Sequence, residues 1–284
     1  MGIKIVTDST SYISKEYIEK YDIEVASLNV IMNGISRREV EIDNRYFYEE
    51  MNESSELPKS SQPMPQEMVD IFKNIVEKGD SVVGVFISSK MSGTYSTANM
   101  AKNMVLEEYP DAEIVILDSE TNCMQLGFIA VQAARSAMEG KSIDEVIDDA
   151  KKVIKSSRFL FTPETLEYLK KGGRIGTAAT LFGNMLKVKP ILTIIDGETS
   201  IFKKVRTRKK AIDEIVEETL SDIENGGLGD IIVHHINCEE EGLKLAKVLE
   251  ERLNRKIKIQ SIGPVVGLHV GPGSIGIAYY KHLK

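Results

Sequence analysis

Apolar runs rich in β-branched residues alternate with amphipathic segments along the first half of the chain. Short apolar runs predict buried strands, and apolar positions three or four residues apart predict helices that cover a sheet. The predicted strands are residues 3–7, 25–32, 82–87 and 114–117, with a hairpin turn at Asn33-Gly34. The predicted helices are residues 15–21, 44–51, 65–78, 94–108, 123–139 and 143–156. This alternation is typical of an α/β fold with a largely parallel sheet.

The pattern changes beyond about residue 158. Asp196-Gly197 lies between two apolar runs and predicts a second hairpin. The predicted strands here are residues 159–161, 191–195, 200–205, 231–234, 257–262 and 277–280. The predicted helices are residues 163–171, 208–223 and 239–253. We therefore predict two domains, residues 1–157 with a mostly parallel sheet and residues 158–284 as an α/β domain with a mixed sheet.

Length and charge exclude several classes of protein. The chain has 284 residues, enough for one large domain or two moderate ones. Its formal net charge of -7 leaves no basic surplus for a nucleic-acid backbone, so we expect no nucleic-acid partner. Its apolar runs are too short to span a membrane. The two cysteines are far apart, which indicates a reducing compartment, and we expect a cytoplasmic protein without a signal peptide.

Composition adds one unusual feature. The chain has 11 Met and 21 Gly but no Trp. Methionine adapts to irregular space, so Met and aliphatic residues can line a pocket for a flexible apolar ligand as well as fill a core. Composition alone does not separate these two roles.

Several motifs for cofactors and metals fail on their context. Residues 271–276 spell Gly-x-Gly-x-x-Gly, but too little chain follows for a dinucleotide-binding unit. His234 and His235 are neighbours on a predicted strand and point to opposite faces, so they cannot chelate one ion with Cys238. We predict no metal and no cofactor. A basic run at residues 203–210 indicates a solvated face or an edge that binds a partner.

Hydroxyl groups follow the predicted strands and precede helices. Ser92-Gly93-Thr94 offers hydroxyls and free N–H groups at a helix start, which favours an anion, although N-capping alone explains such a turn. Ser60-Ser61 forms a second hydroxyl-rich turn, and His269 lies in a predicted glycine-rich loop. Together they predict a carboxylate cradle or a Ser–His nucleophilic pair.

The chain resembles the bacterial DegV family of fatty-acid-binding proteins. The resemblance rests on an ordered series of motifs along the whole chain, at residues 8–11, 60–63, 92–95, 171–175, 189–192 and 263–273. It implies a Rossmann-like N-terminal domain, a C-terminal α/β domain and one long-chain fatty acid, such as palmitate, stearate or oleate, between them. Several members of this family are FakB subunits, which present the carboxylate to a separate fatty acid kinase for acyl-phosphate formation and phospholipid synthesis.

The resemblance also implies site residues. Ser60 and Ser92 match the hydroxyls that bind the carboxylate, with Gly93 as a further donor and Ser61 and Thr94 beside them. Arg174 and His269 match positions near the headgroup. Ser60 replaces the usual Thr, and Met64, Tyr12 and Gln125 also depart from the family pattern, which affects the expected tail preference more than the headgroup chemistry.

The same resemblance implies a carrier that is not itself an enzyme and that works with a kinase partner, without a membrane span and with transient membrane contact left open. The alternative is a serine hydrolase or thioesterase, with Ser92 as nucleophile, His269 as base and Asp8 as the residue that orients the base. A third hypothesis is an adaptor that works through residues 203–210.

Overall fold

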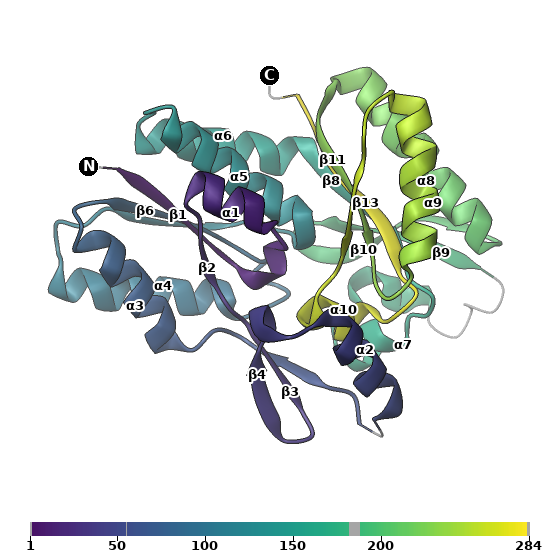
Figure 1. Ribbon diagram of the computed structural model, residues 1–284, viewed down its shortest axis with the longest axis horizontal. Helices are drawn as coiled ribbons and strands as arrows, with labels where there is room; N and C mark the ends of the chain where they lie inside the picture. Colours follow the sequence, from purple (N-terminus) through teal and green to yellow (C-terminus); the bar gives the residue numbers. More distant parts are fainter. Residues whose placement is uncertain (1, 55, 182–187, 283–284) are drawn as a thin grey trace.

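Three sheets carry the fold in the computed structural model, which describes residues 2–54, 56–181 and 188–282 (Figure 1). Sheet A is 4-stranded in the order β2-β1-β6-β7, and all its described pairings are parallel. Its strands are β1 (Ile3–Asp8), β2 (Glu24–Ala26), β6 (Ser81–Phe86) and β7 (Ile114–Asp118). The predicted α/β fold with a parallel sheet is confirmed.

Helices cover both faces of sheet A. On one face α3 (Pro65–Val76) packs against α4 (Thr94–Glu108). The other face carries α1 (Lys15–Tyr21), α5 (Cys123–Met138) and α6 (Ile143–Ser156). Parallel strands joined by helical crossovers need cover on both faces, which explains why these strands are continuous apolar runs in the sequence.

Sheet C is 6-stranded and mixed, in the order β10-β9-β8-β13-β11-β12, and of its described pairings only that of β11 with β12 is parallel. Its strands are β8 (Ser157–Thr162), β9 (Lys189–Ile195), β10 (Glu198–Val205), β11 (Leu228–His235), β12 (Lys258–Ser261) and β13 (Ile275–Lys281). Its helices are α8 (Arg208–Gly226) and α9 (Glu239–Leu253), which pack on the sheet, and the short α7 (Glu167–Lys171) and α10 (Pro264–Val270), which pack on each other.

A small antiparallel sheet B lies beside sheet A, in the order β4-β3-β5. Its elements are β3 (Asn29–Met32), β4 (Ile35–Arg38) and β5 (Lys59–Ser61), with α2 (Asn44–Glu53) between the last two. Asn33 and Gly34 both have positive φ, 52° and 75°, so the predicted hairpin turn is confirmed. Three 3-10 helices occupy Ser9–Ser11, Glu39–Glu41 and Gly176–Leu181 in the described part of the chain.

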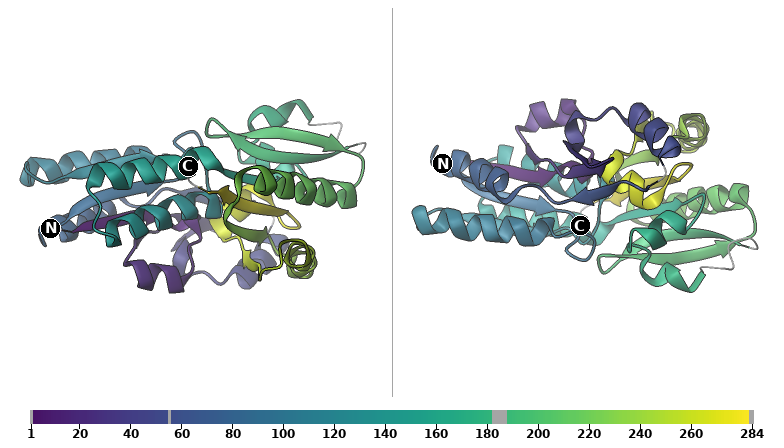
Figure 2. Two further views of the ribbon diagram at one scale, coloured as in Figure 1. Left: turned by 90° about the horizontal axis from the view of Figure 1, so that it is seen from above. Right: turned by 90° about the horizontal axis from the view of Figure 1, so that it is seen from below.

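Helix α5 joins the two halves of the chain. It contacts β1 and β6 of sheet A and also β8 and β13 of sheet C. Most of its residues are buried, including Gln125 and Ser136, as expected for a helix between two layers. Figure 2 shows the two halves side by side along the longest axis, with α10 near the centre. The division into residues 1–157 and 158–284 stays a prediction, since one hydrophobic core contains residues of both halves.

Several predicted elements were wrong in detail. The apolar run 25–32 is split between two sheets, because Leu28 donates its N–H to Ser9 Oγ instead of continuing one strand. Ser60 lies on β5 rather than in a turn, and the helix predicted from residue 163 begins at Glu167. His269, predicted in a loop, belongs to α10. Among the residues that the structure describes, no helix is long and apolar enough to cross a membrane.

Candidate ligand-binding site

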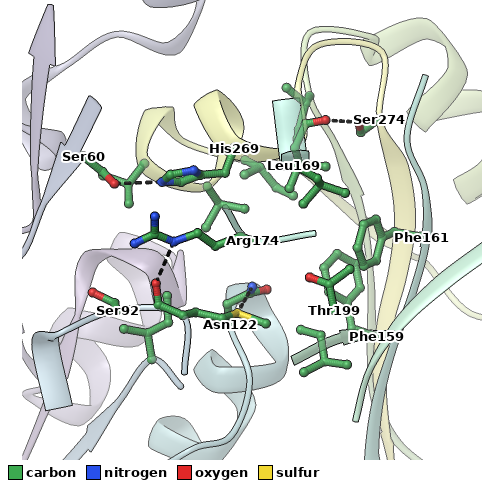
Figure 3. A pocket seen from close by; sticks show the side chains of 18 of the residues that line it. Ser60, Ser92, Asn122, Phe159, Phe161, Leu169, Arg174, Thr199, His269 and Ser274 are labelled. Atoms are coloured by element: carbon green, nitrogen blue, oxygen red, sulfur yellow. Dashed lines mark hydrogen bonds between the residues drawn. The ribbon is translucent and has the colours of Figure 1, made fainter. Parts of the chain in front are cut away.

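A cavity of about 360 Å³ lies between the two halves of the chain. Its size is within the usual range for small-molecule sites, which runs from about 300 to 1,000 Å³. Ser60, Ser92, Arg174 and His269 all line it, together with Ser61 and Gly93 (Figure 3). The structure therefore brings together every predicted site residue except Thr94, which is buried behind Ser92.

Ser60 and His269 form a hydrogen-bonded pair at the polar end of the cavity. Ser60 Oγ lies 2.8 Å from His269 Nε2, and the tautomer of the ring decides which group donates. Burial is the main cause that lowers the pKa of His269 to about 4, with the nearby Arg174 guanidinium as a second cause. The ring is therefore neutral at pH 7 and can accept or donate a hydrogen bond.

The backbone of Gly172 makes room for the His269 ring. A Cβ atom at Gly172 would overlap His269 Nδ1, a buried nitrogen without a hydrogen-bond partner among the described residues. Any larger residue at position 172 must therefore push the imidazole away from Ser60.

Arg174 follows α7 and reaches across the polar end. Its Nε donates to the carbonyl of Met91 at 3.0 Å, and its Nη1 donates to the carbonyl of Gly172 at 2.7 Å. These bonds hold the guanidinium between His269 and Ser92 in the view of Figure 3. Arg174 is exposed, so this end of the cavity faces solvent.

Ser92 and Gly93 form the start of α4. Ser92 Oγ accepts the N–H of Thr94 at 3.3 Å and lies 2.9 Å from the Thr94 hydroxyl. Gly93 precedes the first helical turn, where N–H groups lack intrahelical partners and favour an anion. Serine hydroxyls, helix N–H groups and a guanidinium therefore converge on one end of the cavity.

The other end of the cavity is buried and mostly apolar. Phe159, Phe161 and Ile236 are at most 6% exposed, and Phe159 stacks on Phe161 with ring centroids 5.0 Å apart. Further apolar lining residues are Leu28, Ile87, Leu169, Ile194, Ile262, Val265, Val266, Val270 and Ile275. Among the described methionines Met91 lines the cavity, while others such as Met68 belong to cores. The arrangement suits an amphipathic anion with a long apolar tail.

The Ser92–His269–Asp8 arrangement of the hydrolase alternative is not formed. His269 Nε2 is bonded to Ser60, whereas Ser92 is bonded to Thr94. Both carboxylate oxygens of Asp8 are taken by other groups, since they accept from Thr10 and from the N–H of Ile87. Burial raises the pKa of Asp8 to about 6.

Sequence reasoning did not assign five polar lining residues to the site, namely Gln62, Asn122, Thr199, His234 and Ser274. His234 is fully buried and its Nε2 accepts the N–H of Met124 at 3.2 Å, at the start of α5. Burial lowers the pKa of His234 to about 3, so the ring is neutral. A strand periodicity of two places His234 and His235 on opposite faces, but it does not say which face borders a cavity. Within the described residues no group of three His, Cys, Asp or Glu side chains could hold a metal.

Comparison with known proteins defines the class to which this fold and cavity belong. The family model described as an uncharacterised protein of the DegV family matches residues 2–282, and the chain belongs to the DegV family. A DegV domain-containing protein of Clostridium acetobutylicum is 52% identical over 280 residues, covering 99% of this chain and 98% of the relative.

Solved structures of two relatives are similar over nearly their whole length. DegV of Bacillus subtilis, described as a fatty acid binding protein, has a TM-score of 0.90 and 36% identity, covering 99% of this chain and 100% of that one. A stearic-acid-binding protein of Eubacterium ventriosum has a TM-score of 0.89 and 33% identity, covering 98% of both chains. The fold predicted from the resemblance is thereby confirmed.

Proposed function

We propose that this protein binds one long-chain fatty acid in the cavity between its two halves. The observation that carries the proposal is the change in polarity along the cavity. Exposed Arg174 and the serines line one end, and buried Phe159 and Phe161 line the other. A carboxylate at the first end meets donors, and an acyl chain at the other end leaves water. The stearic acid named for one relative and the fatty acid binding named for another support this choice of ligand.

The apolar part of the cavity supplies most of the affinity. Burial of about 15 methylene groups at roughly 0.8 kcal/mol each gives on the order of 12 kcal/mol before the costs of binding. The hydroxyls of Ser60 and Ser92 and the N–H of Gly93 then mainly fix orientation, because an unpaired carboxylate inside the cavity is costly.

The exposed position of Arg174 supports a carrier role. A carboxylate beside an exposed guanidinium remains accessible to another protein while its tail is buried. We propose that a separate kinase subunit phosphorylates the carboxylate there, and that this chain itself makes and breaks no covalent bond. In the Ser60–His269 pair, His269 is a weak base, because burial and the nearby Arg174 keep its pKa low.

Native mass spectrometry of protein purified without added lipid tests the ligand. We expect an adduct with the mass of a long-chain fatty acid. Apo protein that also fails to bind added palmitate or oleate would refute the proposal.

Two further measurements separate the carrier from its alternatives. A carrier loaded with oleate yields acyl phosphate only with ATP and a kinase subunit. Turnover of an activated acyl ester by this protein alone, lost in Ser60→Ala or Ser92→Ala, would instead establish a hydrolase. Charge reversal at Lys204 and Lys209 tests the predicted basic edge, and loss of kinase binding with intact lipid binding would support it.

A further inference from the structure

Helix α10 carries His269, yet its own sequence supplies no cap for its first turn. Its N-cap is Gly263, which has no side chain, and its first residue is Pro264, which has no N–H. The N–H groups of Val265 and Val266 need acceptors, because both residues are at most 6% exposed. Those acceptors come from residues more than 220 positions earlier in the chain.

Glu39 accepts the first of these N–H groups. Its Oε1 accepts from Val265 N at 2.8 Å and from the Tyr12 hydroxyl at 2.9 Å, and its Oε2 accepts from Ser9 Oγ. Glu39 is 5% exposed although it is charged in water. A carboxylate buried in this way is costly unless its lone pairs are satisfied, and here the surrounding groups are donors.

Tyr12 accepts the second N–H group. Its hydroxyl accepts from Val266 N at 3.2 Å and is 3.3 Å from the carbonyl of Gly263. Tyr48 adds a third contact, because its hydroxyl donates to the carbonyl of Ile262 at 2.8 Å. The start of α10 is thus fastened to the N-terminal half by side chains of Glu39, Tyr12 and Tyr48.

Both ends of α10 border the cavity, with Val265 and Val266 at the first turn and His269 and Val270 at the last. The helix spans only seven residues, so its two ends move together. We propose that Glu39 is a positioning residue of the fatty-acid site, which docks the first turn of α10 on the N-terminal half and so places His269 beside Ser60. The inference rests on the proposed function, but the docking itself is measurable without ligand.

The role of Glu39 is that of an acceptor, and this distinguishes its substitutions. The titratable groups that face it are Asp8, Tyr12, Tyr48 and Cys123, none of them a cation. Burial raises the pKa of Glu39 to about 7, so the site does not depend on a full negative charge. Glutamine keeps an oxygen for Val265 and Tyr12, and its amide can donate to Ser9 Oγ. Alanine offers neither an acceptor for Val265 and Tyr12 nor a partner for Ser9 Oγ.

The experiment compares Glu39→Ala, Glu39→Gln and Tyr12→Phe in the full-length, delipidated protein. Glu41→Ala is the matched control, since Glu41 lies in the same 3-10 segment but its side chain is 63% exposed and pairs with Arg38. Amide exchange at Val265 and Val266 reports docking, and the NMR signals of the His269 ring report its position. Binding of oleate is then titrated for each protein.

In Glu39→Ala we expect exchange at Val265 and Val266 to rise about tenfold or more, and oleate affinity to fall by a similar factor. The pKa of His269 should rise from about 4 toward its ordinary 6.5 as the ring gains water. Glu39→Gln should restore wild-type behaviour within about threefold, and Tyr12→Phe should loosen Val266 more than Val265.

Unchanged His269 signals in both Glu39→Ala and Tyr12→Phe would overturn the proposal. A Glu39→Gln variant that behaves like Glu39→Ala would overturn the acceptor role. If Glu39→Ala does not fold, Tyr12→Phe decides alone. Wild-type protein that binds no fatty acid, with His269 still released in Glu39→Ala, would refute the proposed function and leave the docking role standing.

Discussion

The Ser60 hydroxyl lies 2.8 Å from Nε2 of His269, although 209 residues separate the two in sequence. The bond joins an edge strand of sheet B to the last turn of α10. The polar end of the cavity therefore exists only when both halves of the chain are folded against each other.

Replacement of Ser60 by alanine removes a hydroxyl from the carboxylate end. Because a hydrogen bond to a charged group contributes about 1.5–3 kcal/mol, Ser60→Ala should weaken oleate binding by roughly 10- to 100-fold. Isothermal titration calorimetry on delipidated protein measures this. Ser96→Ala, on the exposed face of α4, is the control and should bind as the wild type does. Equal oleate affinities for Ser60→Ala and Ser96→Ala would show that Ser60 does not bind the carboxylate.

Gly172→Ala tests the space beside the histidine. The added Cβ would displace the His269 ring from Ser60, so oleate affinity should fall about as far as in His269→Ala. A double variant that combines Gly172→Ala with His269→Ala tests whether Gly172 acts through His269. In that case the two losses of affinity should not add. Additive losses would show that Gly172 matters for another reason.

Thr199→Phe tests the apolar end. Thr199 is 5% exposed and lies near Phe159 and Phe161 in Figure 3, so a phenyl ring there occupies space meant for the acyl tail. Affinity for stearate should fall about tenfold more than affinity for laurate, since the longer tail loses more buried methylenes. A thermal melt checks that the core tolerates the larger side chain. The same loss for both acids would contradict this orientation of the tail.

His234 makes stability depend on pH. Its pKa falls from 6.5 in an exposed ring to about 3 when folded, because burial disfavours the charged ring. The unfolded chain therefore binds more protons between these values, and the folded state loses up to about 1.4 kcal/mol per pH unit as pH falls below 6.5.

His234→Gln should remove this contribution. Urea unfolding at pH 7 and pH 5 should show a smaller loss of stability in the variant than in the wild type. His282→Gln, at an exposed position, is the control and should keep the wild-type pH dependence. A parallel pH dependence in His234→Gln would show that other groups cause the acid sensitivity.

The sequence predicted sheet strands better than it predicted α10. Strands such as β6 are buried on both faces and appear as unbroken apolar runs. Residues 263–273 are rich in glycine, which indicates a loop by local propensity. The helix forms there because Glu39 and Tyr12 cap it from far away, and no local rule contains that information.

The candidate site, like the fold, was predicted only in part. Hydroxyl-rich local patterns pointed to Ser60 and Ser92, whereas Arg174 was expected only from the family resemblance. The pairing of His269 with Ser60 rather than Ser92 depends on how the two halves meet. Whether His234 lines the cavity depends on which face of β11 borders it, and tertiary packing determines that face.

Strand β13 lies between β8 and β11 although it follows both in sequence. During synthesis, the strands up to β12 emerge with an unfilled slot in the middle of their sheet, and at about 5–20 residues per second the interval from β8 to β13 lasts roughly 6–25 s. Ile275 and Gly276 of β13 also line the cavity. The edges of β8 and β11 stay unpaired until β13 enters the sheet. Under the proposed function, a nascent chain can therefore hold its lipid only after β13 has been made and has joined the sheet.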